Sequence, residues 1–389
     1  MATSCSFRVF AVLLTLATAA FGQTPLGPVR ALPDDAAEVL AVENQDRPSV
    51  AAGGAGFLAV WQDQRSMLEG NINAPFGTLM GNSQDVYAAR LDAAGKLIDR
   101  KPIVISNQAH VQSIPRVAWN GQHWLVAFLT IRPGDYYSQG LVAVRVAPDG
   151  TVVDATPKVL KAQDGRKELS SLAVASDGSG WAVIWESFNA SGVRGVEGAR
   201  VESNGTVGLV KPIWFDAYNT YAQDAAIAFA TDRFLVTWVR NSGELMALRV
   251  TTSLARIDSA PLRVNASGAG AARPGVASNG ADFLVSWHEA AQALAARIPR
   301  SGAVLDPASI PLGTQQTSAY LAPEPAWNGF EYVIVFEQDP GSLYYQRVGT
   351  DGRKIDAAAV PLASAALSQG QPALASVGDG SAQLVYELG

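Results

Sequence analysis

The chain has 389 residues, 48% of them hydrophobic and 16% charged, with a formal net charge of −6. This composition supplies a packed core and lies outside the range of disordered chains. Because phosphate neutralisation needs clustered lysine and arginine, and the chain has no basic run, we expect no nucleic-acid partner.

The first 22 residues have the pattern of an export signal. Arg8 provides one positive charge, an apolar run follows from Val9 to Ala20, and small residues precede a predicted cut after Gly22. The run is too short to span a bilayer comfortably, and no later segment competes with it, so we expect no membrane span. The lone Cys5 would be lost on cleavage. The sequence therefore predicts a secreted or periplasmic domain over residues 23–389, without disulfides.

One phrase recurs along the chain. The stretch "PRVAWNGQHWLVAF" from Pro115 has counterparts from Pro48, Pro274 and Pro323. Its closing aromatic occurs seven times, as Trp61, Phe128, Trp185, Trp238, Trp287, Phe336 and Tyr386. An arginine followed by an aliphatic residue occurs six times, as Arg90, Arg145, Arg200, Arg249, Arg297 and Arg347. Subtracting each arginine's position from that of the next aromatic gives 38, 40, 38, 38, 39 and 39 residues. A period near 50 residues indicates stacked supersecondary units.

Each unit has the periodicity of strands. In the unit from Pro274, "GVAS" and "DFLVSW" flank an "NG" turn, which predicts a β-hairpin. Gly-ended polar tetrads such as "APDG" and "GTDG" predict a second hairpin. We find no convincing helical period and expect four antiparallel strands, A to D, per unit. Units of this size and composition are propeller blades.

The number of units predicts a seven-bladed propeller that is all-β. Units begin near residues 48, 115, 172, 225, 274, 323 and 372. The last unit supplies only strands A and B, whereas the segment Leu26–Asp35 resembles the outer strands of other units. Joining the two ends in one blade would close the ring and leave no open sheet edge. We expect that closing blade to have four strands or only three.

The first unit also supports a family resemblance. Its text "VWQDQR…DVYAARLDAAG" resembles the repeats of secreted bacterial β-propeller proteins, which are broadly WD40-like. The resemblance implies an architecture and no catalytic residue. The motif also varies between units: the position of Asp63 is taken by Thr130, Ser187, Arg240 and Glu289 in the next four units.

The six repeated arginines are predicted to be structural. They fall in strand C, third from the axis, where they cannot line a central channel. We expect each to pair with an acidic residue of strand B or of the outer hairpin, for example Glu186, Glu289 or Glu337.

Few residues suit a metal or cofactor. His110, His123 and His288 are widely spaced and form no HxxxH or HxH motif. The segment "SDGSGW" (residues 176–181) lacks the spacing of an Asp-box, and neither a P-loop nor a GxSxG motif is present. We therefore expect no metal and no cofactor.

The loops between strands B and C are the predicted binding region. The interval from core aromatic to repeated arginine falls from 29 to 17, 15, 11, 10 and 11 residues, so the length variation lies in the first three units. Loops that vary on a constant scaffold commonly carry function. The candidate binding residues are Phe76 in the first loop, Arg132, Asp135, Tyr136 and Tyr137 in the second, and Trp214, Asp216, Tyr218 and Tyr221 in the D–A loop that leaves the third unit.

These residues favour a non-catalytic, monomeric propeller that binds a glycan or an extracellular protein through the loops of blades 1–4, because aromatic rings beside polar groups suit sugars and protein hot spots. Two alternatives stay open. One is a glycan-acting hydrolase or lyase with carboxylates on the same face, and the other is a purely structural envelope module. Two carboxylates facing each other across the ring mouth would favour the enzyme, whereas an aromatic shelf would favour the binder.

Overall fold

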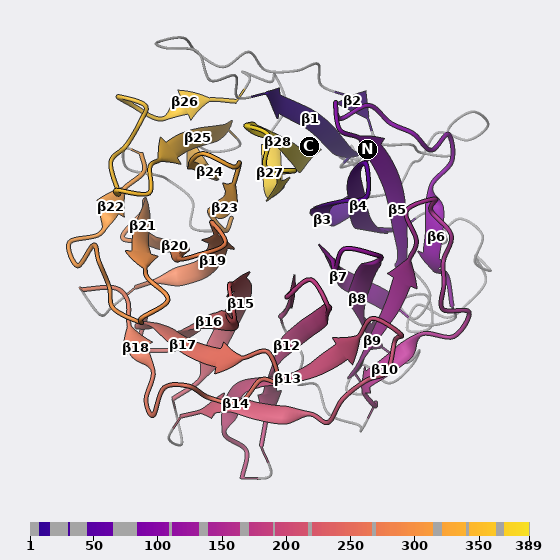
Figure 1. Cartoon of the computed structure of the whole chain (residues 1–389), viewed down its shortest axis with the longest axis horizontal. Helices are drawn as coiled ribbons and strands as arrows, with labels where there is room; N and C mark the ends of the chain where they lie inside the picture. The colour runs from indigo at the N-terminus through magenta and orange to yellow at the C-terminus, as the bar shows by residue number, and fades with distance from the viewer. Residues whose placement is uncertain are drawn as a thin grey trace, which may run out of the picture.

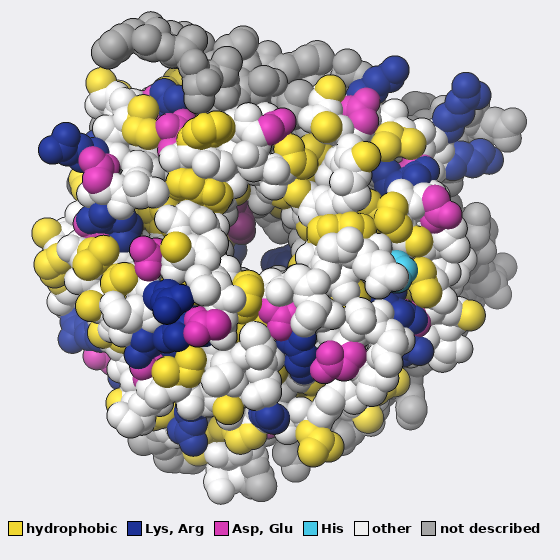
Figure 2. Space-filling model, in the orientation of Figure 1, with side chains coloured by type: hydrophobic (Ala, Val, Ile, Leu, Met, Phe, Trp, Pro, Cys, Tyr) yellow, Lys and Arg dark blue, Asp and Glu magenta, His cyan; other side chains and the backbone are white. Residues whose placement is uncertain are grey.

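The computed structural model shows a ring of β-sheets around a central axis (Figure 1). It describes residues 8–15, 30–31, 45–64, 84–108, 111–131, 139–163, 171–189, 191–216, 220–266, 270–313, 321–339, 342–362 and 369–388. Within these ranges every regular element is a strand. No helix long and apolar enough to cross a membrane was found among them. Figure 2 shows an opening at the centre of the ring, with charges of both signs scattered over the face in view.

Six blades are built from consecutive strands, each a four-stranded antiparallel sheet. Blades 1 to 3 consist of β3 (Gln45–Gly53), β4 (Gly56–Asp63), β5 (Asp85–Asp92) and β6 (Ile103–Ser106); β7 (Val111–Trp119), β8 (Trp124–Ile131), β9 (Gln139–Val146) and β10 (Lys158–Lys161); and β11 (Leu172–Ser176), β12 (Gly180–Phe188), β13 (Arg194–Glu202) and β14 (Lys211–Phe215). Blades 4 to 6 consist of β15 (Ala222–Ala230), β16 (Arg233–Arg240), β17 (Leu245–Thr251) and β18 (Leu262–Arg263); β19 (Ala272–Ser278), β20 (Phe283–Glu289), β21 (Gln292–Ile298) and β22 (Ile310–Pro311); and β23 (Glu324–Trp327), β24 (Tyr332–Asp339), β25 (Ser342–Val348) and β26 (Val360–Pro361). The predicted four-stranded antiparallel blades are confirmed.

A further four-stranded sheet joins the two ends of the chain, in the order β2-β1-β28-β27. It contains β1 (Arg8–Thr15), β2 (Arg30–Ala31), β27 (Gln369–Ala375) and β28 (Ser381–Leu388). The predicted count of seven blades is therefore not met by consecutive strands, which build six. The expected outer strand is present as β2, and this sheet has four strands and not three. The segment predicted as an export signal provides β1, which pairs with β28 from Arg8↔Leu388 to Thr15↔Ser381.

The hydrophobic core lies between neighbouring blades. Strand B is buried on both faces in the first blade, where all eight residues of β4 are buried. Its Leu58 and Val60 pack in one cluster with Trp124, Val126 and Phe128 of the next blade. The closing aromatics of the repeated phrase are fully buried in most blades, and burying each such ring contributes roughly 2 to 3 kcal/mol. The phrase recurs because the space between each pair of neighbouring blades must be filled by similar apolar side chains.

The repeated arginines form a belt near the outer hairpins. In five blades the arginine forms an ion pair with an aspartate nine residues later: Arg90 with Asp99, Arg145 with Asp154, Arg249 with Asp258, Arg297 with Asp306 and Arg347 with Asp356. The structural role and the outer-hairpin partner are thus confirmed.

The strand-B acids offered as examples are wrong partners. In blade 3, Arg200 lies opposite Ala182 in register, whereas Glu186 lies opposite Val196, further along the same strand. The acids that follow the core aromatic therefore sit at the other end of the blade.

In five blades the belt arginine also connects its blade to the next. Arg145 Nη1 donates to the carbonyl oxygen of Ser203 at 2.8 Å, and Arg297 Nη1 donates to that of Thr350 at 2.7 Å. The turn glycine of the receiving hairpin makes room for the guanidinium. At Gly352 (φ +84°) an added Cβ would lie 2.7 Å from Arg297 Cζ. This glycine is required both by its backbone conformation and by the arginine that packs on it.

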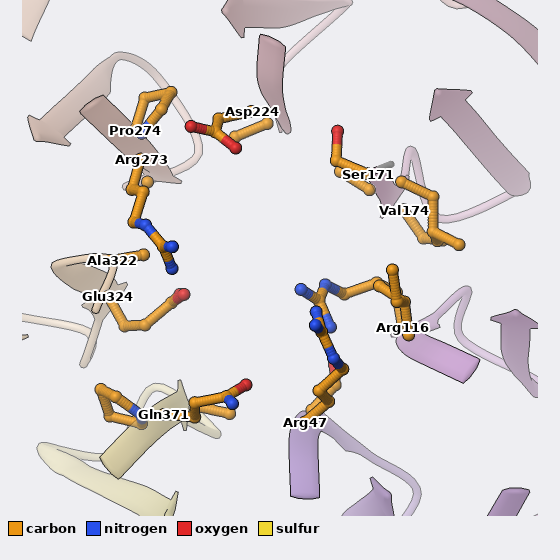
Figure 3. Close-up of a pocket in the computed structure, with 18 of the residues that line it drawn as sticks. Arg47, Arg116, Ser171, Val174, Asp224, Arg273, Pro274, Ala322, Glu324 and Gln371 are labelled. Atoms are coloured by element: carbon orange, nitrogen blue, oxygen red, sulfur yellow. The ribbon is translucent and has the colours of Figure 1, made fainter. Parts of the chain in front are cut away.

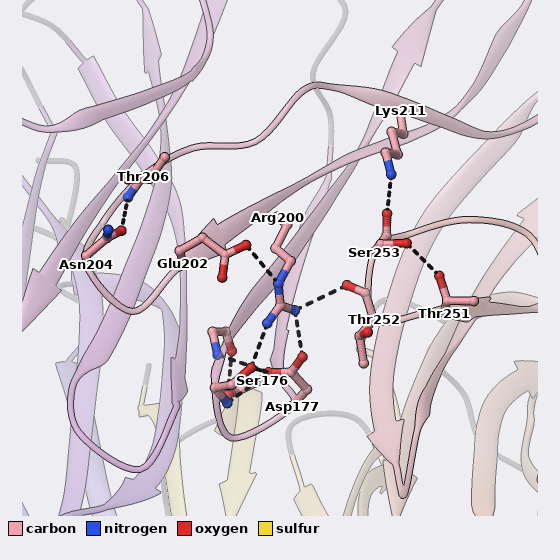
Figure 4. A network of polar contacts seen from close by, with 12 residues as sticks. Ser176, Asp177, Arg200, Glu202, Asn204, Thr206, Lys211, Thr251, Thr252 and Ser253 are labelled. Carbon is pink, nitrogen blue, oxygen red and sulfur yellow. Dashed lines mark hydrogen bonds and ion pairs between the residues drawn. The ribbon is translucent and has the colours of Figure 1, made fainter.

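Blade 3 departs from the belt pattern (Figure 4). The position nine residues after Arg200 is Leu209, which is 86% exposed. Arg200 instead pairs with Asp177 of the A–B hairpin at 2.7 Å and donates to the Thr252 carbonyl of the next blade at 3.2 Å. The connection between blades is kept although the acidic partner comes from another turn.

Candidate functional site at the axial mouth

A ring of strained residues surrounds one end of the central channel. In five sheets the register of the innermost strand shifts one step before the repeated phrase begins. At each shift a non-glycine residue has a left-handed backbone: Arg47, Ile114, Asp224, Arg273 and Gln371, with φ between 37° and 55°. Each such residue costs on the order of 1 kcal/mol, because its Cβ crowds the backbone. Strain of this kind is typically retained where it directs a side chain toward a functional site.

The preceding blade satisfies the backbone of these residues. The amide of Arg47 donates to Glu387 Oε1 at 2.7 Å, and that of Ile114 donates to Gln62 Oε1 at 3.0 Å. The amide of Asp224 donates to Glu186 Oε1. In each case the acceptor directly follows the core aromatic of the neighbouring blade. This link is what holds the left-handed bulges in register around the axis.

The bulges frame a cavity of about 460 Å³ on the channel axis. Such a volume lies within the range of small-molecule sites. It exists because most residues two positions after the bulge are small, including Ala226, Gly275 and Ala373. Because Gln45, at the start of β3, pairs with Asp63, at the end of β4, the mouth opens on the face that carries the B–C loops. This is the face predicted to carry the site.

Five charged side chains line this cavity: Arg47, Arg116, Asp224, Arg273 and Glu324. Figure 3 shows the three guanidinium groups and the Glu324 carboxyl pointing into a common space, with Asp224 at its edge. They come from the inner strands of five different sheets or the residues just before them, so no two belong to the same blade. Only closure of the ring brings them together.

Both carboxyl groups are shifted toward the protonated form. Burial raises the pKa of Glu324 to about 7, an effect that the positive charge of Arg116 partly offsets. The pKa of Asp224 is also raised, mainly by burial and next by the negative charge of Glu186, whereas Arg273 opposes the shift. Near neutral pH, Glu324 is therefore a proton donor in part of the molecules. Carboxyl groups tuned in this way are typical of acid–base catalysis.

A polar network holds Asp224 in place. Glu186 accepts a hydrogen bond from Ser171 Oγ at 2.6 Å and another from the Asp224 amide, and it forms an ion pair with Arg194. The Asp224 carboxylate in turn accepts a hydrogen bond from the Arg273 amide. Glu186 is nearly fully buried, so its charge is fixed in position beside Asp224. Glu186 thus positions Asp224 and sets its charge environment.

The predicted binding residues do not form an aromatic shelf among the described residues. Phe76, Arg132, Asp135, Tyr136, Tyr137 and Tyr218 lie outside the described residues. Trp214 packs against the core between blades 3 and 4, and its Nε1 donates to Asp216 Oδ1 at 2.9 Å. Asp216 is held by Arg240 at 2.6 Å, whereas Tyr221 is exposed. Trp214 and Asp216 therefore stabilise a loop and are already occupied.

The residues at the axial mouth were not predicted from the sequence, because the predicted binding residues were taken from the loops that vary in length. The residue just before the repeated phrase or its counterpart is of six types among the seven sheets; in chain order these residues are Arg47, Ile114, Ser171, Asp224, Arg273, Ala322 and Gln371. A position that varies in charge within a regular repeat was the available signal. Its orientation toward the axis depends on the bulge, which the sequence pattern does not specify.

No protein-family model and no curated protein matches the chain. Several solved structures share its fold. An alpha-L-arabinofuranosidase from Fusarium graminearum has a TM-score of 0.50 at 10% identity, with 82% of this chain and 92% of that one covered. A Trypanosoma rangeli sialidase mutant with trans-sialidase activity has a TM-score of 0.47 at 11% identity, covering 77% of this chain. A GH43 endo-arabinanase from Bacillus licheniformis has a TM-score of 0.40 at 10% identity, with 66% and 96% covered.

The chain spans 56% and 57% of the two Trypanosoma rangeli sialidase chains it resembles. At these identities the similarities show the fold alone. They establish the class: the protein is a β-propeller of four-stranded antiparallel blades.

The prediction of a non-catalytic binding scaffold is contradicted. The axial mouth carries two carboxyl groups with raised pKa values where an aromatic shelf was expected. One structure that shares the fold, at a TM-score of 0.50, is an alpha-L-arabinofuranosidase. Two carboxyl groups at the ring mouth are the feature that was expected of the enzyme alternative and not of the binder.

Proposed function

We propose that this protein is a glycan-acting hydrolase whose catalytic groups are Asp224 and Glu324 at the axial mouth. The observation that carries the proposal is that two carboxyl groups with raised pKa values line one cavity large enough for a sugar. Glycoside hydrolysis commonly needs one protonated and one ionised carboxyl group on either side of the scissile bond. Glu324, with a pKa of about 7, supplies the first, and Asp224 supplies the second.

In the proposed reaction the Glu324 carboxyl donates its proton to the glycosidic oxygen as the bond from that oxygen to the anomeric carbon breaks. The Asp224 carboxylate removes a proton from a water molecule whose oxygen bonds to the anomeric carbon. The products are two shorter saccharides, and Glu324 recovers its proton from solvent as Asp224 releases one. Glu186, fixed by Arg194 and Ser171, keeps Asp224 oriented for this role.

The test is release of reducing ends by the full chain from a panel of neutral and acidic oligosaccharides between pH 5 and pH 9. Asp224→Asn and Glu324→Gln are expected to lower the rate at least 100-fold. Asp351→Asn, in an exposed turn of blade 6, is the matched control and is expected to keep full activity. Turnover of no glycan, or turnover that both active-site variants retain, would contradict the proposal. An unsaturated product detected by ultraviolet absorbance would indicate a lyase instead.

We also propose that the protein is exported and that the sheet joining the two chain ends acts as a seventh blade. The pattern of residues 1–22 supports export. The same segment contributes β1, the strand between β28 and β2. Mass spectrometry of the protein recovered from its native host would decide whether β1 is retained. A mature N-terminus at Gln23 would require the sheet to rearrange.

A further inference from the structure

The arginines of the axial mouth differ from those elsewhere in the molecule. Each belt arginine forms an ion pair with an aspartate, as Arg145 does with Asp154 at 2.8 Å and Arg200 does with Asp177 at 2.7 Å. Within the described residues, the guanidinium groups of Arg47 and Arg273 form no ion pair and no hydrogen bond. Arg116 donates only to the carbonyl oxygen of Pro115, at 2.9 Å. The mouth therefore presents three guanidinium groups without a carboxylate partner in direct contact.

The arrangement is unfavourable without a ligand. Burial lowers the pKa of Arg116, and the charge of Arg47 lowers it further, while Glu324 opposes both effects. Arg47 and Arg273 are exposed and Arg116 is partly buried, so solvent weakens the repulsion between these like charges, and an entering anion would relieve the repulsion that remains. The left-handed backbones of Arg47 and Arg273 add conformational strain at the same place. Nothing in the packing of the blades requires an arginine at either position, because Ile114 and Gln371 occupy the equivalent position in other blades with the same backbone.

The charge balance of the cavity also favours an anion. Its charged lining is three arginines and two carboxyl groups, and the described lining contains no lysine or histidine. Protonation of Glu324 near neutral pH leaves the positive charge in larger excess. Planar guanidinium groups bind carboxylate and sulfate oxygens with paired hydrogen bonds, which a neutral sugar hydroxyl does not match.

We infer that Arg47, Arg116 and Arg273 bind an acidic group of the substrate, so that the glycan taken at the axial mouth is anionic and carries a carboxylate or a sulfate close to the cleaved bond. The inference rests on the proposed function for its placement beside Asp224 and Glu324, but binding is independent of turnover. It specifies the substrate class: an acidic glycan enters and its neutral counterpart is bound weakly.

The experiment measures binding in the full-length Asp224→Asn variant, so that cleavage does not interfere. Oligogalacturonate, its fully methyl-esterified form, and a glycan array with carboxylated, sulfated and neutral members are the probes. We expect an acidic probe to bind at least 10-fold more tightly than its neutral counterpart, with affinity falling as salt rises. The carboxylated and sulfated members of the array distinguish the two sources of charge.

Three further variants in the same background identify the groups responsible. Arg47→Gln and Arg273→Gln are each expected to weaken binding of the acidic probe about 10-fold, and Arg273→Lys is expected to restore part of the loss. Arg353→Gln, in an exposed turn, is the matched control and should change nothing.

Several outcomes would overturn the inference. Equal binding of the methyl-esterified form, binding confined to neutral glycans, and an absence of acidic-glycan binding by the folded protein would each do so. Unchanged binding in both glutamine variants would also overturn it. Acidic-glycan binding without hydrolysis by the unmodified chain would keep the inference and reject the hydrolase, whereas hydrolysis of neutral glycans alone would do the reverse.

Discussion

The belt and the axial mouth use the same residue type in opposite ways. In the belt, each arginine pairs with an aspartate, and five of the six also donate to a carbonyl oxygen of the next blade, as Arg297 does to that of Thr350. In the mouth, Arg47 and Arg273 extend into a cavity without such a partner. The belt repeats along the sequence, whereas the residues at the mouth differ from blade to blade.

This difference teaches how to divide a repeat protein into scaffold and site. A position that every unit must fill for packing returns in every unit, so recurrence indicates structure. A position that the backbone directs toward a shared cavity is free to differ, because seven side chains there together make one site. Charged residues at such a variable position are therefore candidates for a site.

The largest expected effect is a loss of hydrolysis with little change in stability, caused by a substitution at the axial mouth. Asp224→Asn should lower hydrolysis at least 100-fold while the free energy of unfolding changes little, because the amide keeps the shape of the carboxylate and can still accept from the Arg273 amide. Initial rates and chemical denaturation of the same preparations provide the two readouts. A large loss of stability with the loss of activity would place Asp224 in the scaffold and remove the distinction drawn above.

The second largest effect is expected to be a loss of stability with unchanged turnover, caused by a substitution in the belt. Arg297→Ala removes the ion pair with Asp306 and the bond to Thr350, and it leaves Asp306 without its main partner. Since both side chains are partly exposed, we expect a loss of about 1 to 2 kcal/mol in the free energy of unfolding, with unchanged turnover per folded molecule. Arg353→Ala is the control for a surface arginine. Equal stability of the two variants would mean that the belt contributes nothing.

The third effect concerns the pH dependence of stability. The pKa of Glu324 is about 7 in the folded protein and near 4.5 in an unfolded chain, so folding holds its proton more tightly. Stability from this group is complete below pH 4.5, falls as pH rises to 7 and stays low above that. The free energy of unfolding of the Glu324→Gln variant, relative to that of the unmodified protein, should therefore be higher at pH 8 than at pH 4.5.

Urea unfolding midpoints of both proteins at several pH values measure this gain. Arg116 is the charge that opposes the shift at Glu324, and Arg116→Gln should raise the pKa of Glu324 further, so that the decline in stability continues above pH 7. Glu387, whose pKa is also raised to about 7 by burial, should leave some decline in every variant. Parallel pH profiles for the Glu324→Gln variant and the unmodified protein would contradict the assignment.

The smallest effect is expected where the belt departs from its pattern. Leu209→Asp restores the aspartate that the other five blades carry, but Arg200 already pairs with Asp177. We expect a change in the free energy of unfolding within about 0.5 kcal/mol, since the ion pair is replaced rather than added. In an Asp177→Asn background the same substitution should recover most of whatever stability was lost. Calorimetric melting of the four proteins completes this cycle, and an absence of recovery would show that the two aspartates are not equivalent.

The sequence alone determined the repeat, the four strands of each blade and the structural role of the belt. These follow from local chemistry: alternation, turn residues and an arginine that meets an aspartate nine residues away within one hairpin. Only the tertiary structure decided which side chains share the mouth. Arg116 and Glu324 lie 208 residues apart (324 − 116), and they line the same cavity only because the ring closes. Their raised or lowered pKa values depend on that burial, which no local pattern encodes.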